Sequence, residues 1–173
     1  MSKQIFRIGV IGLGEIAQVP LQISSSSQTT TNPVPQVSHI ALLLNLSSYF
    51  RITYLCDVSR ELLKHVSVRV PTAKTTTSAA ELCSSDDVDA VLICSATAFH
   101  PDQVCLALQH DKWVLVEKPI ALCYRDLDRI IAAEAKSKGK VFVGYQRRYA
   151  EAFLDAIEEV KGCKIDYVRV RGM

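Results

Sequence analysis

Two closely spaced glycines follow the first apolar run of the chain. Residues 5–11 are IFRIGVI and residues 12–17 are GLGEIA, here named the glycine segment. Gly12 permits a tight turn, Gly14 removes the side chain that would block a phosphate, and Ala17 lets the next helix pack close to the strand. Free N–H groups at the start of that helix attract negative charge. The segment predicts a pyrophosphate contacted by Gly12, Gly14, Glu15, Ile16 and Ala17, with a purely structural turn as the alternative.

A carboxylate follows the second predicted strand, residues 51–56. At that position Asp57 can accept hydrogen bonds from ribose hydroxyls and repel a 2′-phosphate, which favours NAD over NADP. Arg60 lies close enough to offset the repulsion, so NADP stays open. Asp57 comes 40 positions after Ala17, and residues 22–36, rich in Ser, Thr and Pro, account for the excess over the roughly 20 that the motif expects. A helix-capping aspartate is the alternative.

Polar residues also follow two later predicted strands. Ser95, Thr97 and His100 come after residues 88–94, and Glu117-Lys118-Pro119, here named the EKP turn, comes after residues 113–116. Ligands of open α/β sheets bind at the carboxyl ends of the strands. We therefore expect Ser95, Thr97, His100, Glu117 and Lys118 to contact the cofactor. A capping or core histidine is the alternative for His100.

Lys118 is the predicted catalytic residue. The residue before a proline is restricted to extended geometry, which would hold the lysine rigidly at the mouth of the cleft. Its ammonium can stabilise an alkoxide or relay a proton during hydride transfer. A solvated surface lysine is the ordinary alternative.

Two arginines and a tyrosine follow the last strand of the predicted sheet, residues 141–144. Arg147, Arg148 and Tyr149 suit a polyhydroxy or anionic substrate. An ordinary basic pair on the surface is the alternative.

These residues require a scaffold in which strands and helices alternate. Short apolar runs that alternate with helical patterns indicate an α/β fold with a doubly wound, mostly parallel Rossmann sheet. We predict a nucleotide-binding domain over residues 1–149, interrupted by a flexible insertion at 22–36. Residues 150–173 would form a linking helix (150–161) and the first strand (165–171) of a second domain.

Composition excludes several function classes. The 173 residues carry a formal net charge of +2 without a cationic run, which argues against nucleic-acid and membrane-surface binding. No apolar stretch reaches the roughly 18 residues of a membrane span. The six cysteines include no C-x-x-C pair and no zinc spacing, so we expect no metal site. Reduced, mostly buried thiols and a cytoplasmic location are expected.

Five segments together resemble the Gfo/Idh/MocA family of oxidoreductases. They are GVIGLGEIAQ, ITYLCDVSRE, ATAFHPDQV, VLVEKPIAL and VGYQRRYAEAF. The resemblance implies NAD(P)-dependent oxidation or reduction of sugars, inositols and related alcohols. It also implies that Lys118 is the active-site lysine, often followed by a cis proline, and that Gly12, Gly14, Ala17, Asp57 and His100 match cofactor-site positions.

The same resemblance implies that further catalytic groups lie outside these residues. The family places a catalytic Asp and His, and the open sheet that commonly forms its dimer interface, in a C-terminal domain. We therefore expect an incomplete oxidoreductase that turns over poorly alone, with a small polyol or sugar as substrate and a homo-oligomer if a full-length form exists. A non-catalytic dinucleotide-binding module, such as a sensor or inactive isoform, is the alternative. A short-chain dehydrogenase is excluded because no tyrosine has a lysine four residues later.

Overall fold

The computed structural model describes residues 5–14, 17, 38–165 and 167. The chain divides into two compact units, residues 1–143 and 144–173. The division lies close to the boundary predicted after residue 149. The predicted insertion at 22–36 lies outside the described residues.

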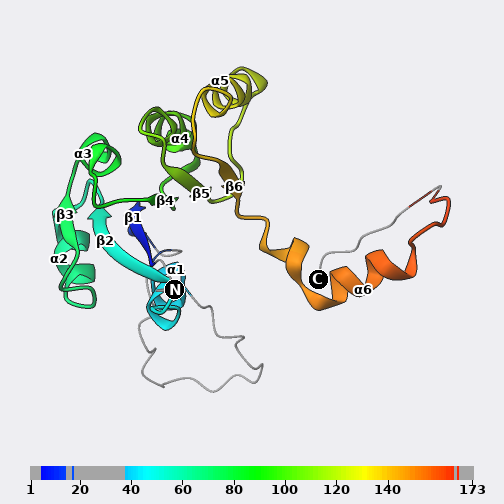
Figure 1. The fold of residues 1–173 in the computed structure, drawn as a ribbon, viewed down its shortest axis with the longest axis horizontal. Coiled ribbons are helices and arrows are strands. Elements are labelled where there is room, and N and C mark those ends of the chain that lie inside the picture. Colours follow the sequence, from blue (N-terminus) through cyan, green and yellow to red (C-terminus); the bar gives the residue numbers. More distant parts are fainter. Residues whose placement is uncertain (1–4, 15–16, 18–37, 166, 168–173) are drawn as a thin grey trace, which may run out of the picture. The chain divides into compact units, whose positions relative to one another are not determined.

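The first unit is built around a parallel sheet of six strands (Figure 1). Its strands are β1 (Phe6–Ile11), β2 (Phe50–Cys56), β3 (Lys74–Thr76), β4 (Ala90–Ile93), β5 (Trp113–Val116) and β6 (Val141–Val143). They lie in the order β3-β2-β1-β4-β5-β6, and every neighbouring pair is parallel. The chain order reverses between β1 and β4, which confirms the predicted doubly wound Rossmann sheet.

Helices occupy both faces of this sheet. They are α1 (His39–Asn45), α2 (Arg60–Ser67), α3 (Ala79–Ser84), α4 (His100–Gln109) and α5 (Tyr124–Glu134). A short 3₁₀ helix at Thr97–Phe99 precedes α4. Helices α3, α4 and α5 lie together on one face, and α1 and α2 pack on the other (Figure 1).

The alternation of side chains along the strands produces two cores. In β4, Val91 and Ile93 pack with α3, α4 and α5, whereas Leu92 packs with α1 and α2. Because both faces are covered, strands such as β1 and β4 are almost continuously apolar. Within the first unit the second face is covered unevenly: Trp113, Leu115 and Phe142 on β5 and β6 are exposed, and the rings of Trp113 and Phe142 stack at 6.3 Å.

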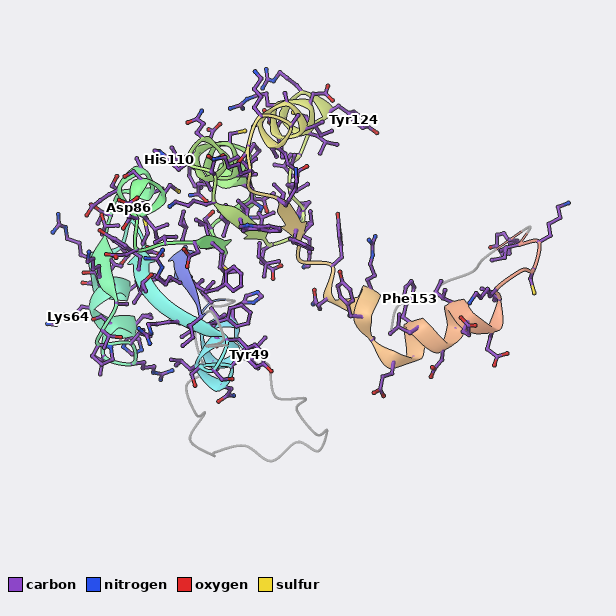
Figure 2. All side chains as sticks on the ribbon, viewed as in Figure 1. Tyr49, Lys64, Asp86, His110, Tyr124 and Phe153 are labelled. Atoms are coloured by element: carbon purple, nitrogen blue, oxygen red, sulfur yellow. The ribbon has the colours of Figure 1, made fainter. Side chains whose placement is uncertain are left out.

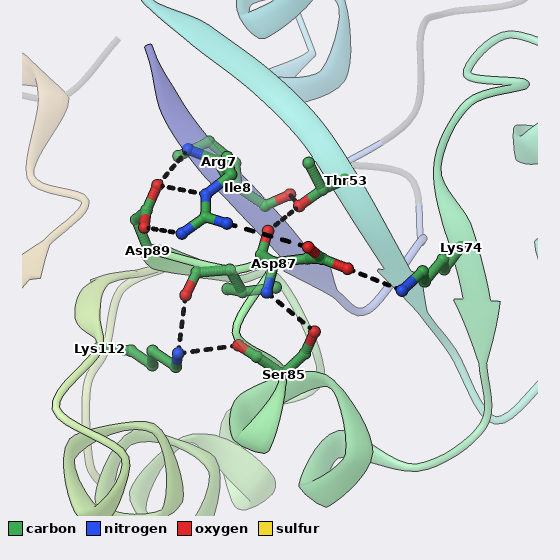
Figure 3. A network of polar contacts seen from close by, with 9 residues as sticks. Arg7, Ile8, Thr53, Lys74, Ser85, Asp87, Asp89 and Lys112 are labelled. Carbon is green, nitrogen blue, oxygen red and sulfur yellow. Dashed lines mark hydrogen bonds and ion pairs between the residues drawn. The ribbon is translucent and has the colours of Figure 1, made fainter. Parts of the chain in front are cut away.

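Charged residues fasten the amino edge of the sheet (Figure 3). The Arg7 guanidinium donates from Nε and Nη2 to the two carboxylate oxygens of Asp89, at 3.0 and 2.6 Å. Lys112 Nζ donates to the carbonyl oxygens of Ser85 and Val88. This network ties the start of β1 to the loop before β4. It lies at the edge of the sheet opposite to the carboxyl ends of the strands.

The second unit contains a 3₁₀ helix at Gln146–Tyr149 and helix α6 at Glu151–Glu159, so a helix is present within the predicted range 150–161, and its linking role stays a prediction. Apolar residues of α6, including Phe153 in Figure 2, are exposed. Of the predicted strand at 165–171, Ile165 and Tyr167 belong to no strand and the other positions lie outside the described residues.

Two global features bear on function. None of the helices in the described ranges is long and apolar enough to cross a membrane. The thiols of Cys56, Cys83 and Cys94 are buried, whereas Cys123 and Cys163 are exposed. The expectation of mostly buried cysteines therefore fits half of them.

Candidate functional site

The glycine segment brings two strand ends into close contact. Gly12 has a φ of +86°, and its N–H donates to the carbonyl of Cys56 at 2.9 Å. A Cβ at this position would lie 2.6 Å from Ser95 Cα and 2.7 Å from the carbonyl carbon of Cys94. Glycine is therefore required here on two grounds, since its backbone is left-handed and the end of β4 occupies the space of a side chain.

Gly14 has free space where a side chain would stand, whereas Gly12 does not. A Cβ built on Gly14 would have no neighbour within 4 Å, and the residue is exposed. Its carbonyl accepts from the N–H of Ala17, which is fully buried. An exposed backbone without a side chain is what the close approach of a pyrophosphate requires, so this part of the segment fits the cofactor. Glu15 and Ile16 lie outside the described residues.

Helix α1 begins directly beside the glycine segment. The Ile40 N–H donates to the carbonyl of Ala17 at 3.2 Å although the two residues are 23 positions apart. The hydroxyl of Ser38 caps the helix by accepting from the N–H of Ala41. The start of α1 is therefore fixed beside the glycine segment by its own cap and by the bond to Ala17.

Asp57 ties the end of β2 to the glycine segment. Its Oδ2 accepts from the N–H of Leu13 at 2.7 Å and its Oδ1 from the N–H of Ser59 at 2.8 Å. Each carboxylate oxygen has a second lone pair that can accept another hydrogen bond. The turn-aspartate alternative thus describes part of its role, and a contact with ribose hydroxyls stays compatible with the geometry.

Ser95 and Thr97 lie at the end of β4, as predicted. Ser95 lies against Gly12, and its hydroxyl donates to the Gln103 side-chain carbonyl at 2.6 Å. Thr97 begins the 3₁₀ helix and is half-buried. The sheet topology therefore brings Ser95 to the same edge as Gly12 and Asp57.

His100 requires a correction. Its ring is 1% exposed, with Nδ1 2.9 Å from the carbonyl oxygen of Pro119 and Nε2 3.0 Å from that of Ser95. With both nitrogens engaged by backbone carbonyls, the ring offers no free polar atom to a cofactor. This is the placement of the core-histidine alternative, in which His100 joins the loop after β4 to the EKP turn.

The EKP turn is held from a second side by a histidine that the sequence reasoning missed. His39 Nε2 lies 2.7 Å from Glu117 Oε1, and the Glu117 side chain is 12% exposed. The other carboxylate oxygen accepts from the N–H of Lys118 at 3.2 Å. Nothing in the sequence around His39 relates it to a glutamate 78 positions later.

Lys118 projects from this fastened turn. The peptide bond between Lys118 and Pro119 is cis, as the family resemblance implies. The lysine is exposed, and among the described residues no group hydrogen-bonds to its ammonium.

Burial, with a contribution from the Glu117 carboxylate, raises the pKa of the nearby Cys94 thiol to about 12, so this cysteine is not a nucleophile at neutral pH.

Arg147, Arg148 and Tyr149 lie in the second unit. All three are exposed residues of the 3₁₀ helix at Gln146–Tyr149. Their predicted contact with substrate stays a prediction.

Comparisons with known proteins converge on one family. The family model described as "Oxidoreductase family, NAD-binding Rossmann fold" (GFO_IDH_MocA) matches residues 6–145. Myo-inositol 2-dehydrogenase of Thermotoga maritima is 27% identical over 184 residues, covering 96% of this chain and 49% of the relative. Inositol 2-dehydrogenase 3 of Saccharopolyspora erythraea is 33% identical over 155 residues, covering 89% and 40%. The chain thus spans half the length or less of these curated relatives.

Solved structures show the same fold. A probable dehydrogenase from Thermotoga maritima has a TM-score of 0.71 at 29% identity, covering 90% of this chain and 41% of that chain. Myo-inositol dehydrogenase from Lactobacillus casei, solved in complex with NAD(H) and myo-inositol, has a TM-score of 0.74 at 24% identity, covering 91% and 41%.

Proposed function

Because the chain belongs to the oxidoreductase family with an NAD-binding Rossmann fold, we propose that its first unit binds NAD(H) along the carboxyl edge of the sheet. The observation that carries the proposal is the open backbone at Gly14 beside the carboxylate of Asp57. The exposed glycine admits the pyrophosphate, and the free lone pairs of Asp57 accept from ribose hydroxyls. Ser95 and Thr97 bound the site at the end of β4.

We further propose that the activity is oxidation or reduction of a polyol or sugar. The bound nicotinamide supplies the hydride acceptor or donor. Lys118 presents an ammonium that has no partner among the described residues, and such a cation stabilises the negative charge that develops on an alcohol oxygen. The relatives named above are inositol 2-dehydrogenases, which supports a cyclic polyol as the substrate class. Arg147, Arg148 and Tyr149 are proposed substrate contacts.

Glu117 acts as a positioning residue in this scheme. Its carboxylate is committed to His39 and to the N–H of Lys118, so it fixes the backbone from which the ammonium projects. This commitment leaves Glu117 poorly suited to accept a proton from substrate.

A dinucleotide-binding module without turnover is the second candidate. The ionisable groups that surround the EKP turn support it: His39 and Glu117 are paired with each other, and His100 faces two carbonyls. Lys118 alone would then have to handle the proton that an alcohol loses. A cytoplasmic location and assembly with a second copy stay predictions from the sequence.

The test is a titration of the full 173-residue chain with NADH, followed by a turnover assay with NAD⁺ and myo-inositol. Lys118→Met removes the ammonium, and Lys136→Met, an exposed lysine after α5, is the matched control. Because the chain is expected to turn over poorly alone, saturable binding with slow but measurable turnover that Lys118→Met alone abolishes supports the enzyme. Binding without turnover supports the module, and absence of saturable NADH binding refutes both.

A further inference from the structure

Two neighbouring residues of α4 hold Ser95 at the end of β4. His100 and Gln103 are three positions apart and therefore lie on one side of the helix. The His100 Nε2 atom lies 3.0 Å from the Ser95 carbonyl oxygen, and Gln103 Oε1 accepts from the Ser95 hydroxyl at 2.6 Å. The second distance is at the short end of the normal range for a hydrogen bond between two oxygens, so the hydroxyl is firmly engaged.

The bond to Gln103 decides which kind of hydrogen bond the Ser95 hydroxyl can still form. A serine hydroxyl has one proton and two lone pairs. Because Gln103 takes the proton, the Ser95 oxygen can only accept from a further partner. The hydroxyl of Thr97 differs, since no partner engages it in the part of the chain that the structure describes, and it stays free to donate or to accept.

This polarity excludes the pyrophosphate as the partner of the Ser95 hydroxyl. Ionised phosphates offer only acceptor oxygens, so they cannot donate to the Ser95 oxygen, although the backbone of Ser95 lies directly against Gly12. The donors of a nicotinamide dinucleotide are its ribose hydroxyls, its carboxamide and its adenine amine. The Ser95 hydroxyl is therefore set to accept from one of these groups.

The order of the strands selects the nicotinamide half of the cofactor. Strand β1, with the glycine segment at its end, lies between β2 and β4. Asp57 follows β2 on one side of the proposed pyrophosphate site, and Ser95 follows β4 on the other side. Beyond β4 come β5 and the EKP turn, whose Pro119 carbonyl oxygen lies 2.9 Å from Nδ1 of the same His100 ring. Ser95 thus lies on the side of Lys118 and away from the proposed adenosine position.

We propose that Gln103 is a positioning residue, which fixes the Ser95 hydroxyl as the acceptor for a hydroxyl of the nicotinamide ribose. The ribose is favoured over the carboxamide because it is attached directly to the pyrophosphate, whose proposed site at Gly12 adjoins Ser95. The inference rests on the proposed function, because it requires NAD(H) to lie along the carboxyl edge of the sheet. It adds a residue that controls, through hydrogen-bond polarity, which group Ser95 accepts.

Three ligands separate the parts of the cofactor. NADH carries the nicotinamide and its ribose, ADP-ribose keeps that ribose without the nicotinamide, and 5′-ADP ends at the diphosphate. Their dissociation constants are measured for the full 173-residue chain at one fixed ionic strength. Gln103→Leu removes the acceptor, and Gln103→Glu keeps an acceptor oxygen. Gln109→Leu, at an exposed glutamine at the end of the same helix, is the matched control.

The decisive quantity is the dissociation constant of 5′-ADP divided by that of ADP-ribose. Both ligands bind the same folded protein through the same diphosphate, so a loss of folded protein or a change at the diphosphate does not alter this ratio. In Gln103→Leu the released Ser95 hydroxyl can donate to the diphosphate and is no longer held as an acceptor for the ribose. The ratio should therefore fall about three- to tenfold, on the order of one neutral hydrogen bond, and NADH should bind more weakly than to wild type.

The two other variants complete the test. Gln103→Glu and Gln109→Leu should each leave the ratio within about twofold of wild type, because an acceptor for the Ser95 proton is retained in both. An unchanged ratio in Gln103→Leu, or a Gln103→Glu variant that behaves like Gln103→Leu, would overturn the inference and leave the proposed function standing. Weaker binding of NADH alone would move the donor to the carboxamide and overturn the assignment to the ribose. Failure of the wild-type chain to bind any of the three ligands would overturn the proposed function as well.

Discussion

Gly12 and Gly14 stand two positions apart, and an alanine substitution should lower stability at Gly12 and cofactor affinity at Gly14. Gly12→Ala places a residue with a Cβ at a φ of +86°, which costs about 1–2 kcal/mol. The new Cβ would also press on the backbone of Cys94 and Ser95, at 2.7 and 2.6 Å, where no side-chain rotation gives relief. Forcing the end of β4 to move adds about 1–3 kcal/mol.

The expected loss for Gly12→Ala is therefore about 2–5 kcal/mol in the free energy of unfolding, a large share of the typical 5–15 kcal/mol. For a chain of this size the melting temperature should fall by roughly 10 °C. Thermal unfolding followed by circular dichroism measures it. Gly139→Ala is the control for the clash alone: its Cβ would meet Lys112, but its φ lies outside the left-handed region.

Gly14→Ala should leave stability intact and affect binding. Its φ lies outside the left-handed region and its Cβ meets nothing within 4 Å, so the melting temperature should be unchanged or rise with a gain of about 0.4–1 kcal/mol. NADH affinity should fall at least about tenfold, because the methyl group occupies the approach of the pyrophosphate. A stable Gly14→Ala variant with wild-type NADH affinity would refute the placement of the phosphates, and an undiminished melting temperature for Gly12→Ala would refute the geometry of the turn.

Three further substitutions or treatments probe the surroundings of the site. His39→Ala should lower the free energy of unfolding, measured by urea denaturation, by about 1–3 kcal/mol, because Glu117 loses a hydrogen-bond partner. His39→Gln, whose amide can donate in place of the imidazole, should recover part of the loss. Equal losses for the two variants would contradict the hydrogen bond. The Arg7 guanidinium holds the pKa of Asp89 below its usual range, so this stabilisation is present at neutral pH and is lost as pH falls through the folded-state pKa. Asp89→Asn should thus cost on the order of 1 kcal/mol at neutral pH, after allowance for solvent screening, and progressively less below about pH 4; a cost independent of pH would argue against the charge. Cys94, with its raised pKa, should resist iodoacetamide at about pH 8 until the chain is unfolded, as peptide mapping would reveal.

Local sequence patterns were sufficient to predict the strands and helices of the sheet. Most strands of the sheet are short apolar runs bounded by polar residues or glycine, and burial on both faces of a parallel sheet produces that signal; β3 (Lys74–Thr76) at the edge of the sheet is polar. The positions of Gly12, Asp57 and the EKP turn follow from the same reasoning, because parallel strands bring their carboxyl ends to one edge. Helix starts also depend on local residues, as at Ser59, whose hydroxyl accepts from the N–H of Leu62 at the start of α2.

The sequence was not sufficient to predict the direction in which polar side chains point. His100 was placed at the right strand end, but its ring turns inward because Ser95 and Pro119 present carbonyls there. One of those residues lies five positions before the histidine and the other 19 after it, and only the folded loops bring both together. Periodicity indicates which face of a helix is apolar, but it says nothing about which distant acceptor a polar side chain will meet.

The two histidines together explain how one exposed lysine can be held in place. His39 reaches the EKP turn from α1 through Glu117, and His100 reaches it from α4 through the carbonyl of Pro119. These helices lie on opposite faces of the sheet and pack in different cores. Since α1 is also hydrogen-bonded to the glycine segment through Ala17, the glycine segment and the turn that carries Lys118 are both anchored to α1. We therefore expect the proposed pyrophosphate site and the proposed reactive end to move together, which would hold the cofactor and the Lys118 ammonium at a fixed distance for hydride transfer.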